Sequence, residues 1–275
     1  MADETLKEKA TELLYFVDTF QFECEAQVLS VDEHVVPDAE TPSSNKIYAI
    51  VLDKTVAYPA GGGQPSDVGR LICNSSSVVF DVTQVVAGKD GIVKHIGTFP
   101  EEGVEPFKKD SEVTVKIDQD TRMLHARIHS AGHLLDFAMG NVGYPSNILR
   151  PAKGLHSVEQ AYVEYDGKVE GLDKDDLIAK LTQEMNKLVT KGGVTQSTLM
   201  AYDDAKNICG GHLPSYIEKD SSPRIVVILD STEGCPCGGT HVTDVSDIGP
   251  VEVTGIRVKK KVTRVSYTIQ GMKEE

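Results

Sequence analysis

Two short segments far apart in the sequence each place two metal-binding side chains four positions apart. The first segment is His129-Ser-Ala-Gly-His133 and the second is Cys237-Gly-Gly-Thr-His241. Zinc prefers imidazole and thiolate ligands, held roughly as a tetrahedron. Neither segment can fill such a shell alone, so the sequence predicts that the fold joins them around one zinc ion. Cys235 is an alternative thiolate, but Cys237 is preferred because it forms the four-residue step with His241.

The local spacing lets each pair of side chains face one ion. Residues four apart in a helix leave the same face, and the apolar positions between residues 120 and 139 recur at helical spacing. In the second segment, two glycines between the ligands permit a tight loop that turns both donors inward. The alternatives are a histidine pair that binds no metal and an ordinary glycine-rich turn with a structural cysteine.

A third segment, Tyr58 to Pro65, reads YPAGGGQP. Three successive glycines permit positive φ and close backbone approach, so that amides can face a ligand. The segment lacks the Lys-Ser/Thr ending of a nucleotide-binding P-loop, which argues against that kind of site. The alternative is a flexible hairpin tip. Three further histidines, His34, His95 and His212, belong to no such pattern. His125, one turn before His129, either supports a ligand from behind or lies on the helix surface, and the surface position is favoured.

The elements that position these segments indicate an α+β protein. A helix is expected over residues 6–16, and a polar loop over residues 37–45. Short β-branched segments then predict a small barrel or sandwich in residues 1–118, with strands at 25–31, 46–52, 69–72, 78–86, 92–96 and 112–117. Residues 119–275 are expected to form an α+β domain with an antiparallel sheet. Its helices are predicted at 120–139 and 172–188, and its strands at 161–165, 194–200, 224–229, 251–258 and 262–269.

The composition is that of an ordinary globular protein of 275 residues and 29.8 kDa. No apolar run is long enough to span a membrane, and from the polar N-terminus we expect no secretory signal. The odd number of cysteines, 5, favours a reducing cytoplasm with free or metal-bound thiols. A monomer is favoured. The net charge of −14 argues against a nucleic-acid partner, yet residues 257–264 read RVKKKVTR. That stretch is either a solvated turn or a ridge that contacts phosphates.

The order GGGQP, HxxxH and CGGTH resembles the editing domain of alanyl-tRNA synthetase, and especially its free-standing relatives, the AlaX trans-editing proteins. The resemblance covers nearly the whole chain, including the segments 53–59, 127–135 and 247–250. It implies a β-barrel domain followed by an α+β domain shared with threonyl-tRNA synthetase editing. With Glu275 as the last residue, we expect the chain to lack the synthetase's activation domain and to be of the medium-sized stand-alone type.

The activity implied by this resemblance is hydrolysis of serine or glycine wrongly attached to tRNA(Ala). Nucleotide and ATP binding follow from the resemblance alone. The implied zinc ligands are His129, His133, Cys237 and His241. The implied substrate-facing residues are Gly61, Gly62, Gly63 and Gln64, together with Gly154, Leu155 and His156 of a pocket strand. Gly132 departs from the HTATH of the synthetases, because glycine replaces a hydroxyl residue there.

Selectivity and mechanism lead to further candidate residues. A pocket that hydrogen-bonds a serine hydroxyl rejects alanine, and Thr55 and Gln64 are the candidate catalytic partners for that hydroxyl. For Thr55, pairing within a strand is the alternative. Four protein ligands would close the zinc shell, so either one ligand is displaceable, or coordination expands to five, or zinc mainly orients the amino acid while another group handles the water. We favour one labile ligand, with zinc binding the attacking water or the amino or hydroxyl group of the amino acid. The candidate tRNA contacts are Lys259, Lys260, Lys261 and Arg264.

Two other functions remain open on the sequence alone. The chain could be a zinc hydrolase of small esters or amides that does not act on tRNA. It could also be a non-catalytic module that zinc only stabilises, whose barrel binds a protein partner. Loss of activity with a retained fold after metal removal would distinguish a working ion from a structural one.

Overall fold

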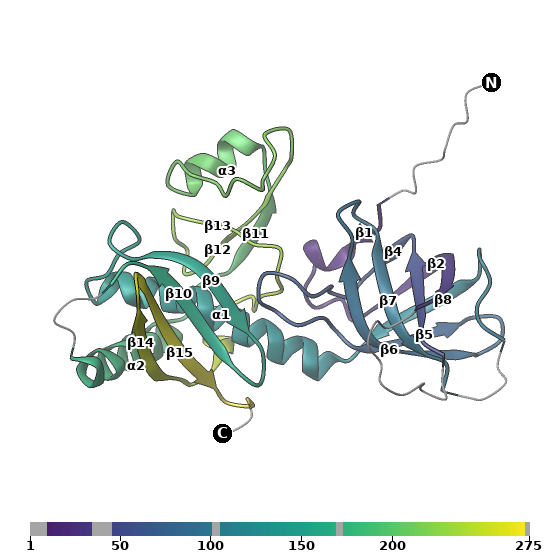
Figure 1. Cartoon of the computed structure of the whole chain (residues 1–275), viewed down its shortest axis with the longest axis horizontal. Helices are drawn as coiled ribbons and strands as arrows, with labels where there is room; N and C mark the ends of the chain where they lie inside the picture. The colour runs from purple at the N-terminus through teal and green to yellow at the C-terminus, as the bar shows by residue number, and fades with distance from the viewer. Residues whose placement is uncertain (1–9, 35–45, 101–104, 169–172, 273–275) are drawn as a thin grey trace. The chain divides into compact units, whose positions relative to one another are not determined.

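The computed structural model describes residues 10–34, 46–100, 105–168 and 173–272, and the chain divides into two compact units (Figure 1). The first unit comprises Met1–Ala60 and Ser66–Arg122, and the second comprises Gly61–Pro65 and Met123–Glu275. A short segment from the first half of the chain therefore belongs to the second unit. Among the described residues, no helix combines the length and the apolar character needed to cross a bilayer.

The first unit is built on a closed antiparallel barrel, as the sequence predicted. Its strands follow the order β2-β3-β7-β6-β5-β8. Valine and isoleucine alternate with polar residues along the strand at Glu112–Ile117, so one set of its side chains points into the barrel interior. The strands are β2 (Glu23–Glu33), β3 (Tyr48–Leu52), β5 (Gly69–Cys73), β6 (Val79–Ala87), β7 (Val93–Thr98) and β8 (Glu112–Ile117).

The predicted helix at residues 6–16 is wrong where the structure describes it. Glu12–Leu13 forms the short strand β1, which pairs in parallel with β4 (Lys54–Thr55), and a single 3₁₀ turn follows at Leu14–Phe16. The Glu12 amide donates to the carbonyl of Asp53 at 2.9 Å. Backbone pairing with a distant segment has therefore overridden a local helical pattern. Residues 6–9 and the predicted loop at 37–45 lie outside the described residues.

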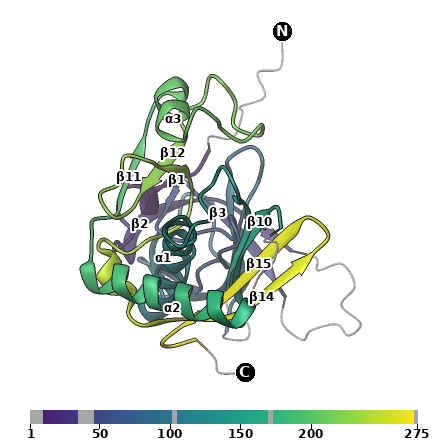
Figure 2. The ribbon, with the colours of Figure 1, turned by 90° about the vertical axis from the view of Figure 1, so that its left-hand side faces the viewer.

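The second unit contains a four-stranded antiparallel sheet in the order β14-β15-β10-β9. Its core joins this sheet to the helices α1 (Gln119–Asn141) and α2 (Lys174–Lys191), and Figure 2 shows α1 nearly end-on and α2 lengthwise. The sequence predicted both helices to within a few residues at each end. The strands are β9 (Arg150–His156), β10 (Ala161–Asp166), β14 (Val251–Lys259) and β15 (Val262–Ile269).

Helix α1 positions the first pair of predicted ligands. The side chain of Asp118 accepts a hydrogen bond from the Thr121 amide at 2.7 Å, which satisfies a free donor at the helix start. Further along, Ile128, Ser130 and Leu134 are completely buried although they point in different directions around the helix. The helix therefore runs through the interior, and its histidines lie in low-dielectric surroundings. His125 is 5% exposed, so its expected surface position is wrong.

A smaller sheet carries the second pair of predicted ligands. Strands β11 (Gln196–Leu199), β12 (Arg224–Val227) and β13 (Cys235–Pro236) form an antiparallel sheet in that order. Helix α3 (Tyr202–Ile208) packs on it through the buried Ala205. The 3₁₀ turn η2 (Val245–Ile248) follows the ligand loop. Strands β4, β13 and helix α3 are missing from the sequence-based prediction because each is too short for a periodic signal.

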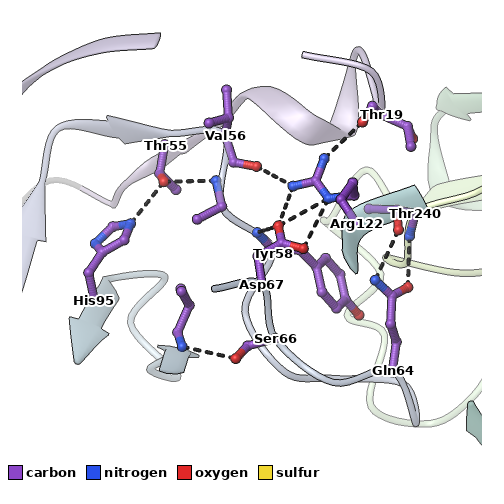
Figure 3. Close-up of polar contacts among 12 residues, drawn as sticks. Thr19, Thr55, Val56, Tyr58, Gln64, Ser66, Asp67, His95, Arg122 and Thr240 are labelled. Carbon is purple, nitrogen blue, oxygen red and sulfur yellow. Dashed lines mark hydrogen bonds and ion pairs between the residues drawn. The ribbon is translucent and has the colours of Figure 1, made fainter. Parts of the chain in front are cut away.

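A buried ion pair in the first unit fixes the two ends of the chain segment that leaves for the glycine-rich turn. Arg122 and Asp67 are 0% and 1% exposed, and the guanidinium pairs with the carboxylate while also donating to the carbonyls of Thr19 and Val56 (Figure 3). Asp67 accepts the Tyr58 amide at 2.7 Å. Removing only one partner of such a fully hydrogen-bonded pair lowers the free energy of unfolding by several kcal/mol, because the other charge stays buried without compensation.

Candidate metal centre and its cavity

Four side chains of the second unit bring their ligand atoms together. These are the nitrogens of His129, His133 and His241 and the sulfur of Cys237, all within 4.8 Å of one another. The Cys237 sulfur lies 3.5 Å from Nε2 of His129 and 3.3 Å from Nε2 of His241. A tetrahedral zinc ion separates sulfur and nitrogen ligands by about 3.5 Å. These four residues, the metal group, could therefore hold one such ion.

Gln64 sets the orientation of His129. Its Oε1 accepts from Nδ1 of His129 at 2.8 Å and from the Thr240 amide at 3.1 Å, while its Nε2 donates to the Thr240 hydroxyl at 2.9 Å. Figure 3 shows the amide of Gln64 facing Thr240. Because an amide oxygen can only accept, Nδ1 of His129 carries the proton. The lone pair of its Nε2 is left to face the metal group.

The other two histidines are held in the same way from their Nδ1 atoms. Nδ1 of His133 lies 3.2 Å from the Cys235 sulfur, and Nδ1 of His241 lies 3.3 Å from the Ser130 hydroxyl. Nε2 of His133 is buried and has no hydrogen-bond partner within the described part of the chain. A metal ion would supply the missing partner. Cys235 thus contacts a ligand from behind, while Cys237 belongs to the metal group.

Burial governs the protonation of the metal group. It holds the pKa of His133 at about 4 and the pKa values of His129 and His241 well below the usual range, with a smaller contribution from nearby positive charge. The three imidazoles are therefore neutral at pH 7 and keep the lone pairs that a metal requires. Burial raises the pKa of the Cys237 thiol, so its proton must leave when a cation binds.

The glycine-rich segment forms a two-residue turn. Gly61 and Gln64 exchange backbone hydrogen bonds at 3.1 and 2.9 Å, and both Gly62 and Gly63 have positive φ, at 56° and 82°. This is the geometry of a type I′ hairpin, which glycine adopts without strain. A Cβ on Gly63 would lie 2.3 Å from the Gly154 carbonyl oxygen of β9. Positive φ and close approach, both predicted for these glycines, explain why the turn can deliver Gln64 to His129.

The loop that carries Cys237 and His241 is shaped by two residues. A Cβ on Gly239 would lie 2.2 Å from the His129 ring, so only glycine leaves room for that imidazole. Arg224 on β12 is buried and donates to the carbonyls of Cys237 at 2.8 Å and Gly239 at 2.9 Å. Nothing in the local sequence around Arg224 identifies this role, since it depends on how β12 pairs with the next strand, β13.

The metal group opens onto a cavity of about 370 Å³ in the second unit. His129, His133 and Cys237 are among the residues that line it. The remaining polar lining includes Asp136, Lys153, His156 and Tyr216, in addition to the glycines Gly62, Gly132, Gly154 and Gly238. A small substrate could therefore enter next to the metal group, among groups of both charges.

His156 lies in the cavity wall and is held by a hydrogen-bond chain. Its Nδ1 is 2.7 Å from the Tyr267 hydroxyl, which in turn donates to the Ile128 carbonyl at 2.9 Å. The phenol proton of Tyr267 is donated to the Ile128 carbonyl, so Nδ1 of His156 donates to the phenol oxygen. Nε2 of His156 is then left as an acceptor. A Cβ on Gly132 would lie 2.4 Å from the His156 ring, and one on Gly154 would lie 2.2 Å from its Nε2. Gly132, the departure from HTATH, thus makes room for His156.

Thr55, one of the two predicted catalytic residues, lies in the first unit rather than among the residues that line this cavity. Its hydroxyl is completely buried and contacts Nε2 of His95 at 2.8 Å and the Ala57 amide at 3.0 Å (Figure 3). His95 also contacts the carbonyl of Ile50 at 3.1 Å. His95, for which no role was expected, is therefore a core residue whose pKa burial lowers to about 4.

The predicted basic residues lie at the β14–β15 hairpin. Lys259 and Lys260 line a hollow of about 330 Å³ there, together with Arg264. The guanidinium of Arg264 pairs with Glu164 at 2.6 Å and stacks on the Tyr162 ring at 3.8 Å. Its charge is thus partly neutralised. The lysines at this tip are exposed and enter no ion pair within the part of the chain that the structure describes.

The sequence profile described as tRNA synthetases class II (A) matches residues 2–121. An alanyl-tRNA editing protein AlaX-M from Methanosarcina mazei is 28% identical over 268 residues, which span 94% of this chain and 95% of that protein. An AlaX-M from Pyrococcus horikoshii is 31% identical over 243 residues, with 88% and 89% covered. An alanine–tRNA ligase from Methanothrix thermoacetophila is 29% identical over 266 residues, which span 94% of this chain but 25% of the ligase.

Proposed function

This chain belongs to the family of AlaX-M alanyl-tRNA editing proteins, and from that premise we propose that it removes serine or glycine from mischarged tRNA(Ala) in trans, using zinc. The observation that carries the proposal is the metal group opening onto a cavity of about 370 Å³. In the reaction, water adds to the carbonyl carbon of the aminoacyl ester. The bond from that carbon to the ribose oxygen breaks, and the ribose oxygen takes the proton.

His129, His133, Cys237 and His241 would hold the zinc ion. When bound, zinc can polarise an ester carbonyl or lower the pKa of coordinated water. Three side chains keep the ligands in place from outside the shell. Gln64 and Ser130 hold two imidazoles through their Nδ1 atoms, and Cys235 contacts the third. Such outer partners fix the tautomer and direction of each ring.

His156 offers the cavity an acceptor for a hydroxyl group. Its Nδ1 is engaged by Tyr267, so Nε2 can accept from the serine hydroxyl or from the attacking water. A bound alanine would leave this acceptor unpaired, which favours serine. We assign this role to His156 rather than to Thr55 or Gln64, because the polar groups of those two residues already have partners in the folded chain.

The nucleic-acid end of the substrate has candidate partners at the cavity rim and at the hairpin. Tyr216 lines the cavity and is 77% exposed, so its ring is available to stack on the terminal base. Lys153, also exposed, lines the same cavity and suits a nearby phosphate. Lys259, Lys260 and Lys261 are proposed to contact the tRNA backbone further away.

A deacylation panel tests the proposal. Ser-tRNA(Ala), Gly-tRNA(Ala), Ala-tRNA(Ala) and a small seryl ester are each incubated with the full chain, with and without a chelator. We expect hydrolysis of the first two, little of the third, and loss of activity in chelator with retained circular dichroism. His133→Ala should abolish deacylation, while the exposed His212→Ala should not. Equal rates on the seryl ester and Ser-tRNA(Ala) would instead indicate a general esterase.

The basic hairpin has its own test. Replacing Lys259, Lys260 and Lys261 by alanine should weaken tRNA binding and reduce the slope of log K against log salt by about 0.7–0.9 for each phosphate that is no longer neutralised. A matched triple replacement of the exposed Lys174, Lys187 and Lys191 on α2 is the control. An unchanged slope in the hairpin variant would remove this surface from the proposal.

A further inference from the structure

Asp136 is the carboxylate of the cavity that neither the metal group nor its outer partners use. It lies on α1 one turn beyond His133, so both side chains leave a similar face of the helix. Among the described residues that line the cavity, no other is an aspartate or a glutamate. The negative charge available to a bound substrate is therefore concentrated at this point of the wall.

The carboxyl group of Asp136 is held in a fixed place but is only partly engaged. The hydroxyl of Tyr165, a completely buried residue on β10, donates to its Oδ1 at 2.8 Å. Within the described residues Oδ2 accepts no hydrogen bond, and Asp136 forms no ion pair there. An oxygen that accepts nothing from the protein, in the wall of a cavity, is suited to accept from a ligand.

The surroundings make a cationic ligand favourable. Burial raises the pKa of Asp136 to about 7, although the hydrogen bond from Tyr165 lowers it. A carboxylate that is poorly solvated gains most from a cation placed against it, since the cation replaces the lost water. In the described part of the chain, no lysine or arginine forms an ion pair with Asp136. The ammonium group of a substrate can therefore be the cation that pairs with it.

We propose that Asp136 binds the α-ammonium group of the aminoacyl ester and so fixes the amino acid next to the metal group. The inference rests on the proposed function, because it names the part of the substrate that this cavity recognises. It also separates two roles within the cavity. The amino group goes to the carboxylate on α1, which leaves the metal group for the carbonyl or the water.

The test compares a free with a blocked amine. The probes are Ser-tRNA(Ala), N-acetyl-Ser-tRNA(Ala), and stable adenosine analogues that carry serine or N-acetylserine on a 3′-amide. The proteins are the full chain, Asp136→Asn, and Asp120→Asn as a matched control for an exposed carboxylate on the same helix. Asparagine can still accept from Tyr165, so the fold should persist, and the melting temperature checks this.

The wild type and Asp120→Asn should favour the free amine by about 10- to 100-fold, in kcat/KM and in the affinity for the analogues, because a hydrogen bond to a charged group contributes about that much. Asp136→Asn should reduce this preference to less than about threefold. A preference that survives in Asp136→Asn overturns the inference, whatever its effect on the absolute rate.

The two proposals fail in different ways. If no aminoacyl-tRNA is hydrolysed but the analogues still show a preference that depends on Asp136, the deacylase proposal fails and the ammonium site stands. If deacylation occurs and the preference does not depend on Asp136, the ammonium site fails alone. If the wild type neither hydrolyses nor binds any of the probes, both are overturned.

Discussion

Replacing Gln64 by methionine should weaken zinc binding without removing a ligand. The amide of Gln64 makes three hydrogen bonds, at 2.8 Å with Nδ1 of His129, 3.1 Å with the Thr240 amide and 2.9 Å with the Thr240 hydroxyl. Methionine has a similar length but offers none of these. Loss of an outer partner typically costs 10- to 100-fold in metal affinity, or about 1.4–2.7 kcal/mol. We expect Gln64→Met to fall in that range.

The buried Thr240 amide adds a separate effect on folding. Left without its acceptor, it should reduce the free energy of unfolding by about 1–3 kcal/mol. The glutamate variant distinguishes the two effects. Gln64→Glu still accepts from His129 and from the Thr240 amide, and the Thr240 hydroxyl can reverse its role and donate. Its zinc affinity should therefore equal or exceed that of the wild type.

The assay is competition for zinc between the metal-free full chain and a chromogenic chelator at fixed pH. Gln270→Met, at an exposed position of the same unit, controls for the substitution itself. The reasoning would be refuted if Gln64→Met bound zinc as tightly as the wild type. It would also fail if Gln64→Glu were as weak as Gln64→Met, because the acceptor at Nδ1 of His129 would then be irrelevant.

Three further predictions concern other positions. The folded pKa of His95 is about 4 against 6.5 unfolded, so the unfolded chain binds more protons between these values. Up to about 3 kcal/mol of the free energy of unfolding should therefore be lost as pH falls from 6.5 to 4. Urea titrations should show a loss smaller by that amount in His95→Asn than in the wild type. Gly132→Thr should destabilise the chain by about 1–3 kcal/mol in thermal melts, because the new side chain clashes with the His156 ring. The same substitution should cost much less in a His156→Ala variant, where that ring is absent. Tyr216→Ala should raise KM for Ser-tRNA(Ala) by about 5- to 100-fold while Tyr216→Phe should not, and an unchanged KM in Tyr216→Ala would exclude stacking.

The sequence was most informative where chemistry and spacing are local. The two four-residue steps place His129 with His133 and Cys237 with His241, and the fold brings these pairs within 4.8 Å of one another. The barrel strands were likewise predicted to within a few residues, since β-branched content along a strand is a local signal. The N-terminal segment failed because its hydrogen bonds go to residues about forty positions away.

The supporting residues could not have been found in the same manner. Arg224, Ser130 and Tyr267 act through hydrogen bonds with residues 13 or more positions away, and no local pattern distinguishes them from ordinary core residues. Gln64 could be placed near the site only by family resemblance. Its hydrogen bond to His129 joins residues 65 positions apart. Asp136 also could not be identified, because nothing in the helical pattern of α1 distinguishes it from the other polar residues of that helix.

The assignment of Gly61–Pro65 to the second unit has a consequence for dividing the protein. Two covalent crossings surround this pentapeptide, and a third follows Arg122. A recombinant fragment that starts at residue 119 would retain all four residues of the metal group yet lack Gln64, leaving the imidazole of His129 without its orienting amide. Splitting the gene there yields pieces that are each incomplete. Adding a synthetic peptide that spans the glycine turn should restore zinc affinity to the fragment.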